Sequence, residues 1–575
     1  MRLRPPPAAV LLCLAITAAC DDAPSPVDSP RASPPPALAR PNVAVGITVG
    51  QPVSYDATQG GTVFTGGGEL RYGITFEGAA NGLTATGATV VGEPLAPGVT
   101  WATLVATDAV GRTASDRFAI AAFAQGLAAP ALPAAPFDYA DAAVLLPAHF
   151  RVPGNGGPVV STDNTPADNP VTNAGATLGR VLFYDTRVSA NDALSCGGCH
   201  SPFAGFSDTP RLSAGFAGAL TARHTPSLVN ARFYRRGRFF WDERAATLEA
   251  QVLRPIQDGT EMGMPLENLV AKIQATRFYA PLFAAAFGTP EVTGDRVAKA
   301  LAQYVRSLVS TGSRYDRAFT PAGTPNFAAV FTPQEVDGER LFRASGCAAC
   351  HATVSQVSDS IHNTGLDVVS ADTGAGRGAF KAPSLRNVAV RPRFMHDGRF
   401  TTLAQVVDFY DSGVQPNPNL DPRLRTPNGT PRRLNLTPAQ KASLVAFLNT
   451  LTDSAFLAAP RFANPFAPPL TSPAPATPAT PTTPAPATPT PAPGSVSIQA
   501  NSYRPATLTV SPGAVVTWTN LDNSRHSASF ASAAVGATPI FTSGTQRLTM
   551  PATPGTYAYQ CAVHGAAMQG TVIVQ

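Results

Sequence analysis

The spacing of apolar and polar residues changes three times along the 575-residue chain. Residues 42–124 hold short β-type runs, such as Val99–Thr107 and Arg117–Ala122, between turns rich in Gly, Asn and Thr, which predicts a small β-sandwich. Apolar residues recur at helical spacing between 137 and 460, and β-type runs return between 495 and 575. We therefore expect a multidomain protein with a mainly α-helical centre and a β-sandwich on either side.

Start signals for two helices lie in the second half of this centre. Thr332–Glu335 is a capping box with proline at the first helical position, and Thr437–Gln440 starts a helix in which Leu444 and Leu448 recur at helical spacing. The first of these helices leads directly to a Cys-x-x-Cys-His motif. A helix before such a motif and a final apolar helix are the elements that a cytochrome c domain needs to enclose its haem.

Two Cys-x-x-Cys-His motifs, Cys196–His200 and Cys347–His351, give the strongest chemical signal in the chain. In this motif both thiols attach to the haem vinyl groups, and the histidine binds the iron from one side. A redox dithiol or half of a zinc site has similar spacing, but the presence of two such motifs favours haem. We predict two covalently bound c-type haems held by Cys196, Cys199, His200, Cys347, Cys350 and His351.

The first 20 residues have the pattern of an export signal. An apolar run over Ala8–Ala19 follows a basic start and is shorter than the ~20 apolar residues of a membrane helix. Small residues before Cys20 favour a lipid-anchored cysteine, although Thr17 stands where leucine is usual and leaves ordinary cleavage open. We expect a protein of the periplasm or cell surface that contacts a membrane only through this lipid anchor.

Two segments of low complexity separate these parts. Residues 21–41 are rich in Pro, Ser and Ala and predict a disordered tether, while the Ala/Pro/Thr repeat within 461–494 predicts an extended linker. Charged residues make up only 14% of the chain, and the net charge of +5 is spread without a Lys/Arg block. Nucleic acid is therefore not an expected partner.

The helical centre contains an internal repeat. Thr225–Asn230 in the first copy matches Ala382–Asn387 in the second. Phe240–Arg244 in the first copy likewise matches Met395–Arg399 in the second. We therefore predict two duplicated cytochrome c domains, over residues 137–325 and 326–460.

The two copies differ where a second iron ligand would lie. Pro255 follows Trp241 by fourteen residues, and Tyr410 follows His396 by the same number. If this position faces the iron opposite its histidine, proline leaves the first iron open, whereas tyrosine can close the second. This asymmetry suits a division of labour between chemistry at one haem and electron storage at the other.

Over about residues 137–455 the chain resembles the bacterial diheme cytochrome c peroxidases, and within them the methylamine-utilisation diheme oxidase branch. The resemblance rests on the segments Leu194–His200, Phe240–Asp242, Glu261–Met262, Phe380–Asn387 and Met395–Gly398. It implies a peroxidatic haem on the first motif and an electron-transfer haem on the second.

The resemblance also implies roles for three residues near the first haem. Trp241 would be the bridge between the haems, Glu261 the catalytic distal acid, and Gln251 a polar residue of the distal pocket. Peroxide heterolysis needs a group that moves a proton from the near to the far oxygen, and a glutamate at position 261 can do this. Simpler interpretations remain open, with Glu261 as a solvated surface carboxylate and Trp241 as a core residue.

Several positions depart from the peroxidases. Phe216 stands where a displaceable distal histidine is usual, so the first haem is expected to be open without reductive activation. Tyr410 stands where the peroxidases use methionine and resembles the oxidase branch, and Met395 is the competing ligand of the second iron.

A calcium ion between the two haem domains is usual in the family, and the sequence does not decide whether one binds here. His224 replaces an asparagine of that site, and Arg391 and Arg393 lie where neutral carbonyl donors are usual. His149 and His362 are expected to be surface or packing residues rather than ligands.

The C-terminal β-region, residues 495–575, looks like a cupredoxin. Its candidate copper ligands are one distant histidine and three residues of a single loop, namely His526, Cys561, His564 and Met568. Two imidazoles, a thiolate and a weak thioether form a type 1 copper site, which transfers electrons. The alternative is a sandwich with a buried free cysteine. The N-terminal sandwich resembles the immunoglobulin-like or cadherin-like modules of secreted bacterial proteins, and we expect a spacer or adhesion module.

Together these features predict an oxidoreductase of the cytochrome c peroxidase type. It would reduce hydrogen peroxide with electrons that pass from the copper domain through the second haem, and an external protein could donate electrons to it. Two alternatives stay open: an oxidase that modifies Trp or Tyr of a partner protein, and a non-catalytic exported electron carrier.

Overall fold

The computed structural model describes residues 33–139, 146–152, 158–357, 360–466, 494–499, 502–521, 526–530, 532, 534–541, 544–562 and 565–575. The expected export signal, most of the tether before residue 42 and most of the linker before residue 494 lie outside these ranges. Within the ranges, no helix combines the length and the apolar character that crossing a membrane requires.

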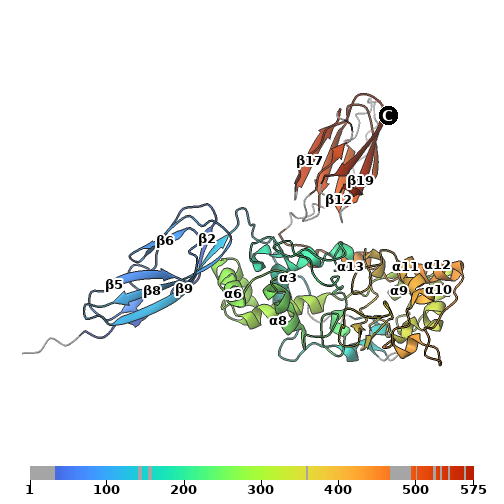
Figure 1. The fold of residues 1–575 in the computed structure, drawn as a ribbon, viewed down its shortest axis with the longest axis horizontal. Coiled ribbons are helices and arrows are strands. Elements are labelled where there is room, and N and C mark those ends of the chain that lie inside the picture. The colour runs from blue at the N-terminus through green and yellow to red at the C-terminus, as the bar shows by residue number, and fades with distance from the viewer. Residues whose placement is uncertain are drawn as a thin grey trace, which may run out of the picture.

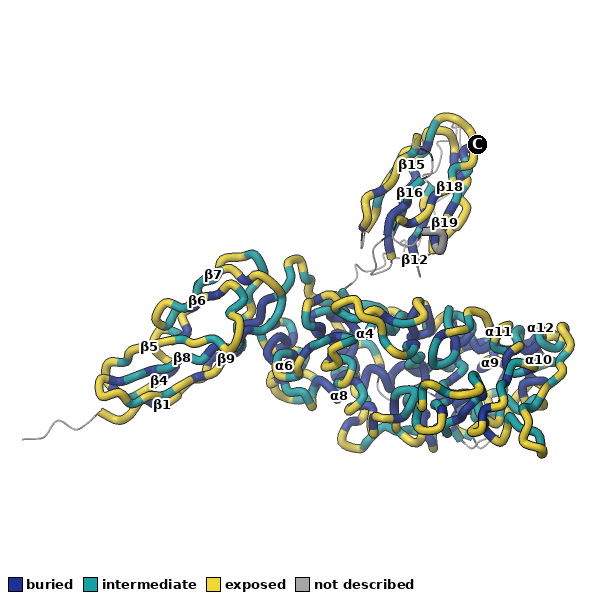
Figure 2. The backbone as a smooth tube through the Cα atoms, in the orientation of Figure 1, coloured by how far each residue is buried: buried dark blue, intermediate teal, exposed yellow. Residues whose placement is uncertain are grey.

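The N-terminal part consists of two main β-sheets that share one apolar core. The first sheet has the strand order β2 (Val45–Thr48), β9 (Thr113–Phe123), β8 (Gly98–Thr107) and β5 (Arg71–Phe76). The second has the order β3 (Val53–Asp56), β7 (Thr89–Gly92) and β6 (Leu83–Thr86), and a short pair joins β1 (Ala37–Leu38) to β4 (Phe64–Thr65). Along β8, buried residues alternate with more exposed ones, as a strand with one face on a core requires (Figures 1 and 2).

This β-region packs directly against the helical centre. Its strands β8 and β9 contact α6 (Leu266–Ala275), and Trp101 Nε1 donates a 2.9 Å hydrogen bond to Asn268 Oδ1 of that helix. Arg117 forms ion pairs with Glu77 of its own sheet and with Glu267 of α6. The expected spacer is therefore in firm contact with the part of the chain that holds the first haem motif.

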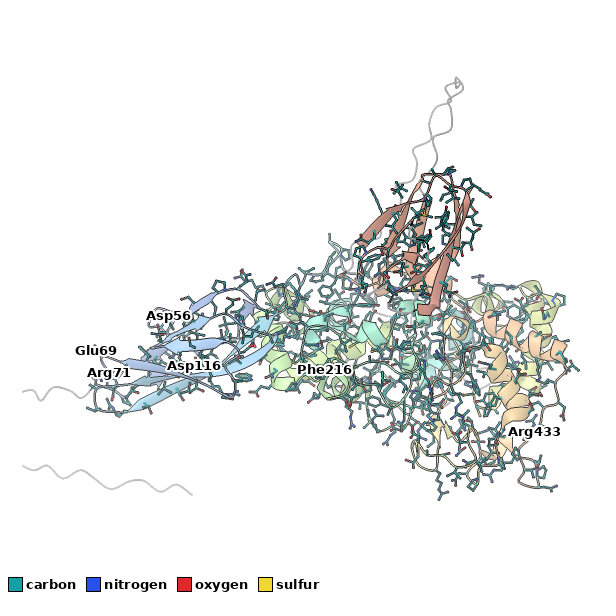
Figure 3. All side chains as sticks on the ribbon, turned by 45° about the horizontal axis from the view of Figure 1, so that its top comes forward. Asp56, Glu69, Arg71, Asp116, Phe216 and Arg433 are labelled. Atoms are coloured by element: carbon teal, nitrogen blue, oxygen red, sulfur yellow. The ribbon has the colours of Figure 1, made fainter. Side chains whose placement is uncertain are left out.

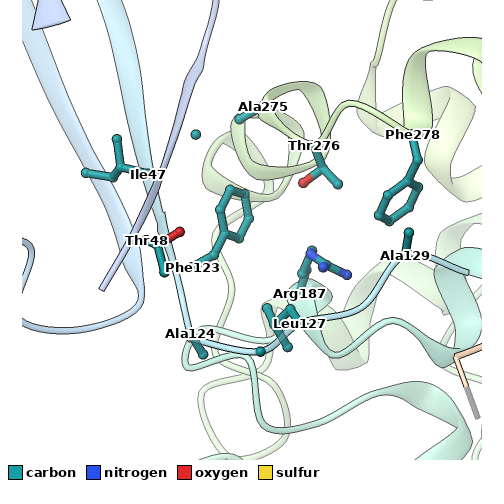
Figure 4. A pocket seen from close by; sticks show the side chains of 12 residues that line it. Ile47, Thr48, Phe123, Ala124, Leu127, Ala129, Arg187, Ala275, Thr276 and Phe278 are labelled. Atoms are coloured by element: carbon teal, nitrogen blue, oxygen red, sulfur yellow. The ribbon is translucent and has the colours of Figure 1, made fainter. Parts of the chain in front are cut away.

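The contact surface includes a buried ion pair and a small pocket. Lys272 of α6 pairs with Asp192, both side chains are 0% exposed, and the other oxygen of Asp192 accepts a 2.9 Å hydrogen bond from the amide of Ala124. A pocket of about 330 Å³ lies beside this pair, between the end of β9 at Phe123 and the side chain of Arg187 (Figure 4). The charge of Arg187 is already paired with Asp185.

The first half of the centre is built on the pair α3 (Asn173–Tyr184) and α8 (Gly294–Ser307). Gly179 allows the close approach, because a Cβ atom there would lie 2.0 Å from the carbonyl oxygen of Ala300. The remaining helices of this half are α2 (Ala148–Arg151), α4 (Cys196–Cys199), α5 (Leu248–Gln257), α6, and α7 (Tyr279–Phe287).

The second half repeats this arrangement with α10 (Pro333–Ala344) and α12 (Pro438–Asn449). Here a Cβ atom at Gly338 would lie 1.9 Å from the carbonyl oxygen of Ser443. Both helices begin where their sequences predict, and each begins with a capping box, which the sequence predicted for α10. The other elements are α9 (Arg314–Arg317), α11 (Leu403–Asp408), a π-helical turn (Phe409–Gly413), α13 (Ser454–Leu457), and the strand pair β10 (Ile361–His362) and β11 (Phe380–Lys381).

The backbone confirms the sequence repeat. Asn230 and Asn387 are both left-handed, with a φ of 58°, and Phe240 and Met395 have φ values of 67° and 70°. Each amide of the asparagine pair bonds to the carbonyl that follows the last long helix of its half, at Leu308 or Leu451. Equivalent residues of the two halves therefore occupy equivalent places.

The C-terminal part has two sheets of four strands each around one core. The first sheet has the order β13 (Ser502–Arg504), β12 (Gly494–Gln499), β15 (Val515–Asn520) and β17 (Gly544–Thr549). The second has the order β14 (Thr507–Val510), β19 (Gly565–Val574), β18 (Gly555–Cys561) and β16 (Ser529–Phe530). Trp518 fills the centre and is 0% exposed.

Candidate functional site

A pocket of about 770 Å³ opens beside the first Cys-x-x-Cys-His motif. Its walls include both cysteines and the histidine of the motif, together with four residues that the sequence placed around the first haem, namely Trp241, Gln251, Pro255 and Glu261. The Nδ1 atom of His200 lies 3.0 Å from the carbonyl oxygen of Phe206, which leaves the Nε2 atom to bind a metal. The donor atoms and the size of the cavity therefore fit a covalently bound haem.

Helix α5 forms one wall of this pocket. The Thr247 side chain caps its first turn by accepting from the amide of Ala250, and both Gln251 and Pro255 line the cavity from this helix. Residues four apart lie on the same helix face, so the polar amide and the proline ring face the cavity together. Proline offers no donor atom to a metal, so this wall presents only Gln251 for hydrogen bonding.

Glu261 follows α5 in a tight turn and lines the same pocket. Both polar groups of its backbone are hydrogen-bonded. The amide donates to the carbonyl oxygen of Asp258, and the carbonyl oxygen accepts a 2.8 Å hydrogen bond from the amide of Phe216. Burial raises the pKa of the Glu261 carboxyl, and the nearby charge of Asp258 raises it further. A half-buried pocket residue with a raised pKa is not a freely solvated surface carboxylate.

Phe216, labelled within the helical centre in Figure 3, does not line the pocket. Its ring packs against Gly263, where a Cβ atom would lie 2.4 Å from the ring. The position that carries a displaceable histidine in the peroxidases therefore supplies no ligand in this structure.

Trp241 lies at the junction of the two halves. Its indole Nε1 donates a 2.7 Å hydrogen bond to the carbonyl oxygen of His224, and its own carbonyl oxygen accepts one of 2.8 Å from the amide of Lys381 in the second half. The amide of His224 in turn donates to the carbonyl oxygen of His396. One hydrogen bond thus holds the indole and two more join its surroundings to the second half, so Trp241 lies at the junction, which is the place that a bridging residue requires.

The second motif, Cys347–His351, follows α10, and both candidate ligands of its iron lie nearby. Burial raises the pKa of Tyr410 well above its usual value, and the neighbouring thiols of Cys350 and Cys347 raise it further. Tyr410 and Met395 pack on the same apolar cluster. The residues fit a haem here as well, and the choice between tyrosine and methionine stays a prediction.

Tyr410 sits on a π-helical turn, whereas its counterpart Pro255 sits on a regular α-helix. A π-turn adds a residue to the helical turn and re-aims the side chain that it carries. The two halves therefore differ in backbone as well as in residue type at this position.

Three of the four candidate copper ligands belong to described residues. Cys561 Sγ lies 3.8 Å from His526 Nδ1, and both residues are 0% exposed, while Met568 is buried in the same core. Two ligands that share one metal through bonds of roughly 2 Å lie at about this separation. The residues fit copper, and His564 lies outside the described residues.

Comparison with known proteins decides the family. The chain is 35% identical over 303 residues to the methylamine utilization protein MauG of Methylorubrum extorquens, which covers 50% of this chain and 80% of that protein. The chain belongs to the di-haem cytochrome c peroxidase and MauG family. A family model described as di-haem cytochrome c peroxidase matches residues 173–322, and a cupredoxin-like domain model matches residues 476–574.

The relatives of this chain include both MauG proteins and cytochrome c peroxidases. Cytochrome c551 peroxidase of Nitrosomonas europaea is 30% identical over 314 residues, which cover 52% of this chain and 85% of that protein. Among solved structures, a MauG-like protein associated with microbial copper homeostasis is 31% identical, with a TM-score of 0.48 over 53% of this chain and 97% of that chain. The protein is thus a di-haem oxidoreductase with a C-terminal cupredoxin-like domain.

The family's calcium does not fit the residues found between the two halves. His224 lies 3.0 Å through Nε2 from the Ser207 hydroxyl and 3.2 Å through Nδ1 from the carbonyl oxygen of Arg211, so neither ring nitrogen is free. The guanidinium of Arg391 is buried beside it. Among the described residues, no group of three or more His, Cys, Asp or Glu side chains could hold a metal ion.

Two histidines that we expected to be packing residues are buried and paired with aspartates. His149 Nε2 lies 2.9 Å from Asp316, and His362 Nδ1 lies 2.6 Å from Asp421. Neither occurs in a metal-binding group among the described residues.

Lys381 is a pocket residue that sequence reasoning missed. It lines the first pocket, its Nζ lies 4.0 Å from the centre of the Tyr234 ring, and burial lowers its pKa to about 8. The only sequence signal was its place in the family segment Phe380–Asn387, which belongs to the second half.

Proposed function

We propose that this protein reduces hydrogen peroxide to two molecules of water, with two electrons and two protons, at the haem of the first motif. The observation that carries the proposal is the difference between the surroundings of the two haem motifs. Pro255 lines the pocket of the first motif and offers no donor atom to a metal, whereas Tyr410 lies beside the second motif.

A haem bound by Cys196, Cys199 and His200 supplies an iron that can bind peroxide and exchange electrons. The residues of the chain transfer the substrate's proton and orient the peroxide. Glu261 would accept a proton from one oxygen of the peroxide and return it to the other, leaving oxygen, while Gln251 would donate a hydrogen bond that orients the peroxide.

Electrons are proposed to pass from the copper domain to the second haem and then, past Trp241, to the first. Support comes from the hydrogen bonds that hold the indole between the two halves, and from the fusion of a cupredoxin-like domain to the same chain. Two modules on one chain meet at an effective concentration of the order of millimolar. The physiological donor to the copper domain is a further protein.

The test uses the purified full chain with both haems and copper, reduced before the experiment. We expect hydrogen peroxide to oxidise the copper, seen as the return of its visible absorption, with two electrons consumed per peroxide. Glu261→Gln keeps the shape but accepts no proton, and should slow the reaction by roughly 10²–10⁴-fold.

Cys561→Ser is the matched control for the electron source. It removes the copper thiolate without touching either haem pocket, so peroxide should still oxidise the haems, but repeated turnover from the cupredoxin should stop. Full turnover in Cys561→Ser, or no copper oxidation in the unchanged chain, contradicts the proposal.

A second function, oxidation of Trp or Tyr side chains on a partner protein, is favoured by specific residues. Tyr410 replaces the methionine of the peroxidases, and Phe216 leaves the first pocket without a displaceable histidine. The relative from Methylorubrum extorquens is named for methylamine utilization. A mass increase on a co-expressed partner that requires Glu261 would favour this function over simple peroxide reduction.

We also propose that the protein is exported and lipid-anchored through Cys20, on the sequence pattern of the first 20 residues. Fractionation of cells that express the full chain tests this. The unchanged protein should sediment with membranes, and Cys20→Ser should move to the soluble exported fraction.

A further inference from the structure

A buried cation without an acidic partner lies between the two haem-binding halves. Arg391 is 9% exposed, its Nη2 donates to the carbonyl oxygen of Ser384, and its Nε has no hydrogen-bond partner among the described residues. Burial lowers the pKa of Arg391 to about 10, and no nearby acid opposes that shift. The group still carries its full charge at neutral pH.

The position of Arg391 gives its charge access to both halves. A Cβ atom at Gly205, in the loop after the first haem motif, would lie 3.6 Å from Arg391 Cγ. In the second half, its Nη2 donates to the carbonyl oxygen of Ser384, and the Ser384 hydroxyl donates a 2.7 Å hydrogen bond to the carbonyl oxygen of Ser355, four residues after His351. One positive charge therefore acts on the junction and on the surroundings of the second haem.

A calcium ion at this junction would meet unfavourable neighbours. Calcium takes six to eight oxygen ligands, mostly from carboxylates and carbonyls, whereas the side chains at this junction include an imidazole already bonded on both sides and a buried guanidinium, neither of which is an oxygen donor. Two cations at close range in a poorly solvated place repel each other strongly. We propose that the Arg391 guanidinium takes the place of the family's calcium ion, so that this protein joins its two haem halves and supplies the positive charge between them without metal.

The first experiment measures calcium on the full-length protein loaded with both haems and copper. After dialysis against millimolar calcium and then calcium-free buffer, elemental analysis should find no stoichiometric calcium. Treatment with a calcium chelator should leave the unfolding temperature and both haem midpoint potentials unchanged. One retained calcium per chain, or a chelator effect on either readout, overturns the proposal.

The second experiment separates the charge of Arg391 from its shape. Arg391→Gln removes the charge and keeps hydrogen-bonding groups, and should shift the midpoint potential of the second haem to more negative values. Arg391→Lys keeps the charge and should stay close to the unchanged protein. Arg393→Gln, a more exposed arginine two residues away, is the matched control and should shift the potential less.

A reverse substitution completes the test. His224→Asn combined with Arg391→Gln restores a neutral junction, and calcium should now raise its unfolding temperature. Unchanged potentials in Arg391→Gln overturn the proposal even if calcium is absent. None of these readouts depends on peroxide turnover, so the result stands apart from the proposed reaction.

Discussion

Glu261 determines how the proposed reaction should depend on pH. Its pKa is raised, first by burial and then by the charge of Asp258. A group that must accept a proton acts as the carboxylate, so kcat/KM should fall as the pH drops through this raised pKa. We expect the acidic limb of the pH profile to lie above the ~4.3 of an ordinary glutamate.

Two variants check this assignment by steady-state kinetics across pH. Asp258→Asn removes a negative neighbour, so the acidic limb should move to lower pH while turnover persists. Glu261→Gln should abolish the limb along with most of the activity. A limb that survives in Glu261→Gln belongs to another group, and the assigned role of Glu261 would then be wrong.

The ligand of the second iron can be decided at single residues. We expect Tyr410→Phe to change the low-spin electron paramagnetic resonance signal of the second haem, because it removes the only oxygen that this side chain could offer. Met395→Leu, which packs on the same cluster, should leave the signal unchanged. The opposite pattern would assign the iron to Met395.

The same spectrum tests the whole assignment of cofactors. The unchanged protein should show one high-spin haem, one low-spin haem and one type 1 copper. Two low-spin haems and no high-spin signal would favour the electron carrier over both enzymatic functions.

Local spacing carries the haem prediction and most of the copper prediction, because Cys-x-x-Cys-His and the loop with Cys561, His564 and Met568 each place donors within a few residues of one another, whereas His526 lies 35 residues before Cys561. Cys196–His200 and Cys561 belong to such motifs. The side chain of Arg391 was not predictable, since its burial depends on packing between the two halves. Lys381 was missed for the same reason, because it belongs to one half and lines the pocket of the other.

Among the elements, helix starts were predicted better than helix contacts. Thr332–Glu335 and Thr437–Gln440 form their capping boxes, because these hydrogen bonds join residues three apart. The tight approach of Gly338 to Ser443 joins residues more than a hundred positions apart. Sequence patterning contains no comparable signal for such a contact.

The buried ion pair between Lys272 of helix α6 and Asp192 lies where this helix meets the N-terminal sheets, and we expect it to contribute to the free energy of unfolding. Asp192→Asn leaves the Lys272 ammonium without its charge partner at a fully buried place, and should lower the free energy of unfolding by about 3–5 kcal/mol. Denaturant unfolding of the unchanged protein and the variant measures this loss.

A double variant separates lost charge pairing from general damage. Asp192→Asn with Lys272→Met removes both charges and should recover much of the lost stability, since no unpaired charge remains buried. Equal losses in the single and double variants would mean that the pair has no special role. Arg117→Gln, at the exposed edge of the same contact, should cost less than about 1 kcal/mol.

At the scale of the whole molecule, the proposed electron delivery from the copper domain takes place within one chain, because the linker joins donor and acceptor. The rate of copper oxidation after peroxide addition should therefore not change when the protein is diluted. Cutting the linker between residues 467 and 493 should make the same rate fall in proportion to concentration. Stopped-flow measurements at several dilutions distinguish these outcomes, and a concentration-dependent rate in the uncut chain would contradict delivery within one chain.

The lining of the first pocket has a consequence for how this chain could have arisen. Seven of its wall residues come from the second half, namely Val357, Ala371, Asp372, Lys381, Ala382, Pro383 and Ser384. A gene duplication produces two copies that can at first function separately. Here the pocket of one copy is lined in part by residues of the other, so the two copies can no longer be separated. Once one copy closes the cavity of the other, neither can be lost, exchanged or inherited alone, and the pair evolves as a single unit.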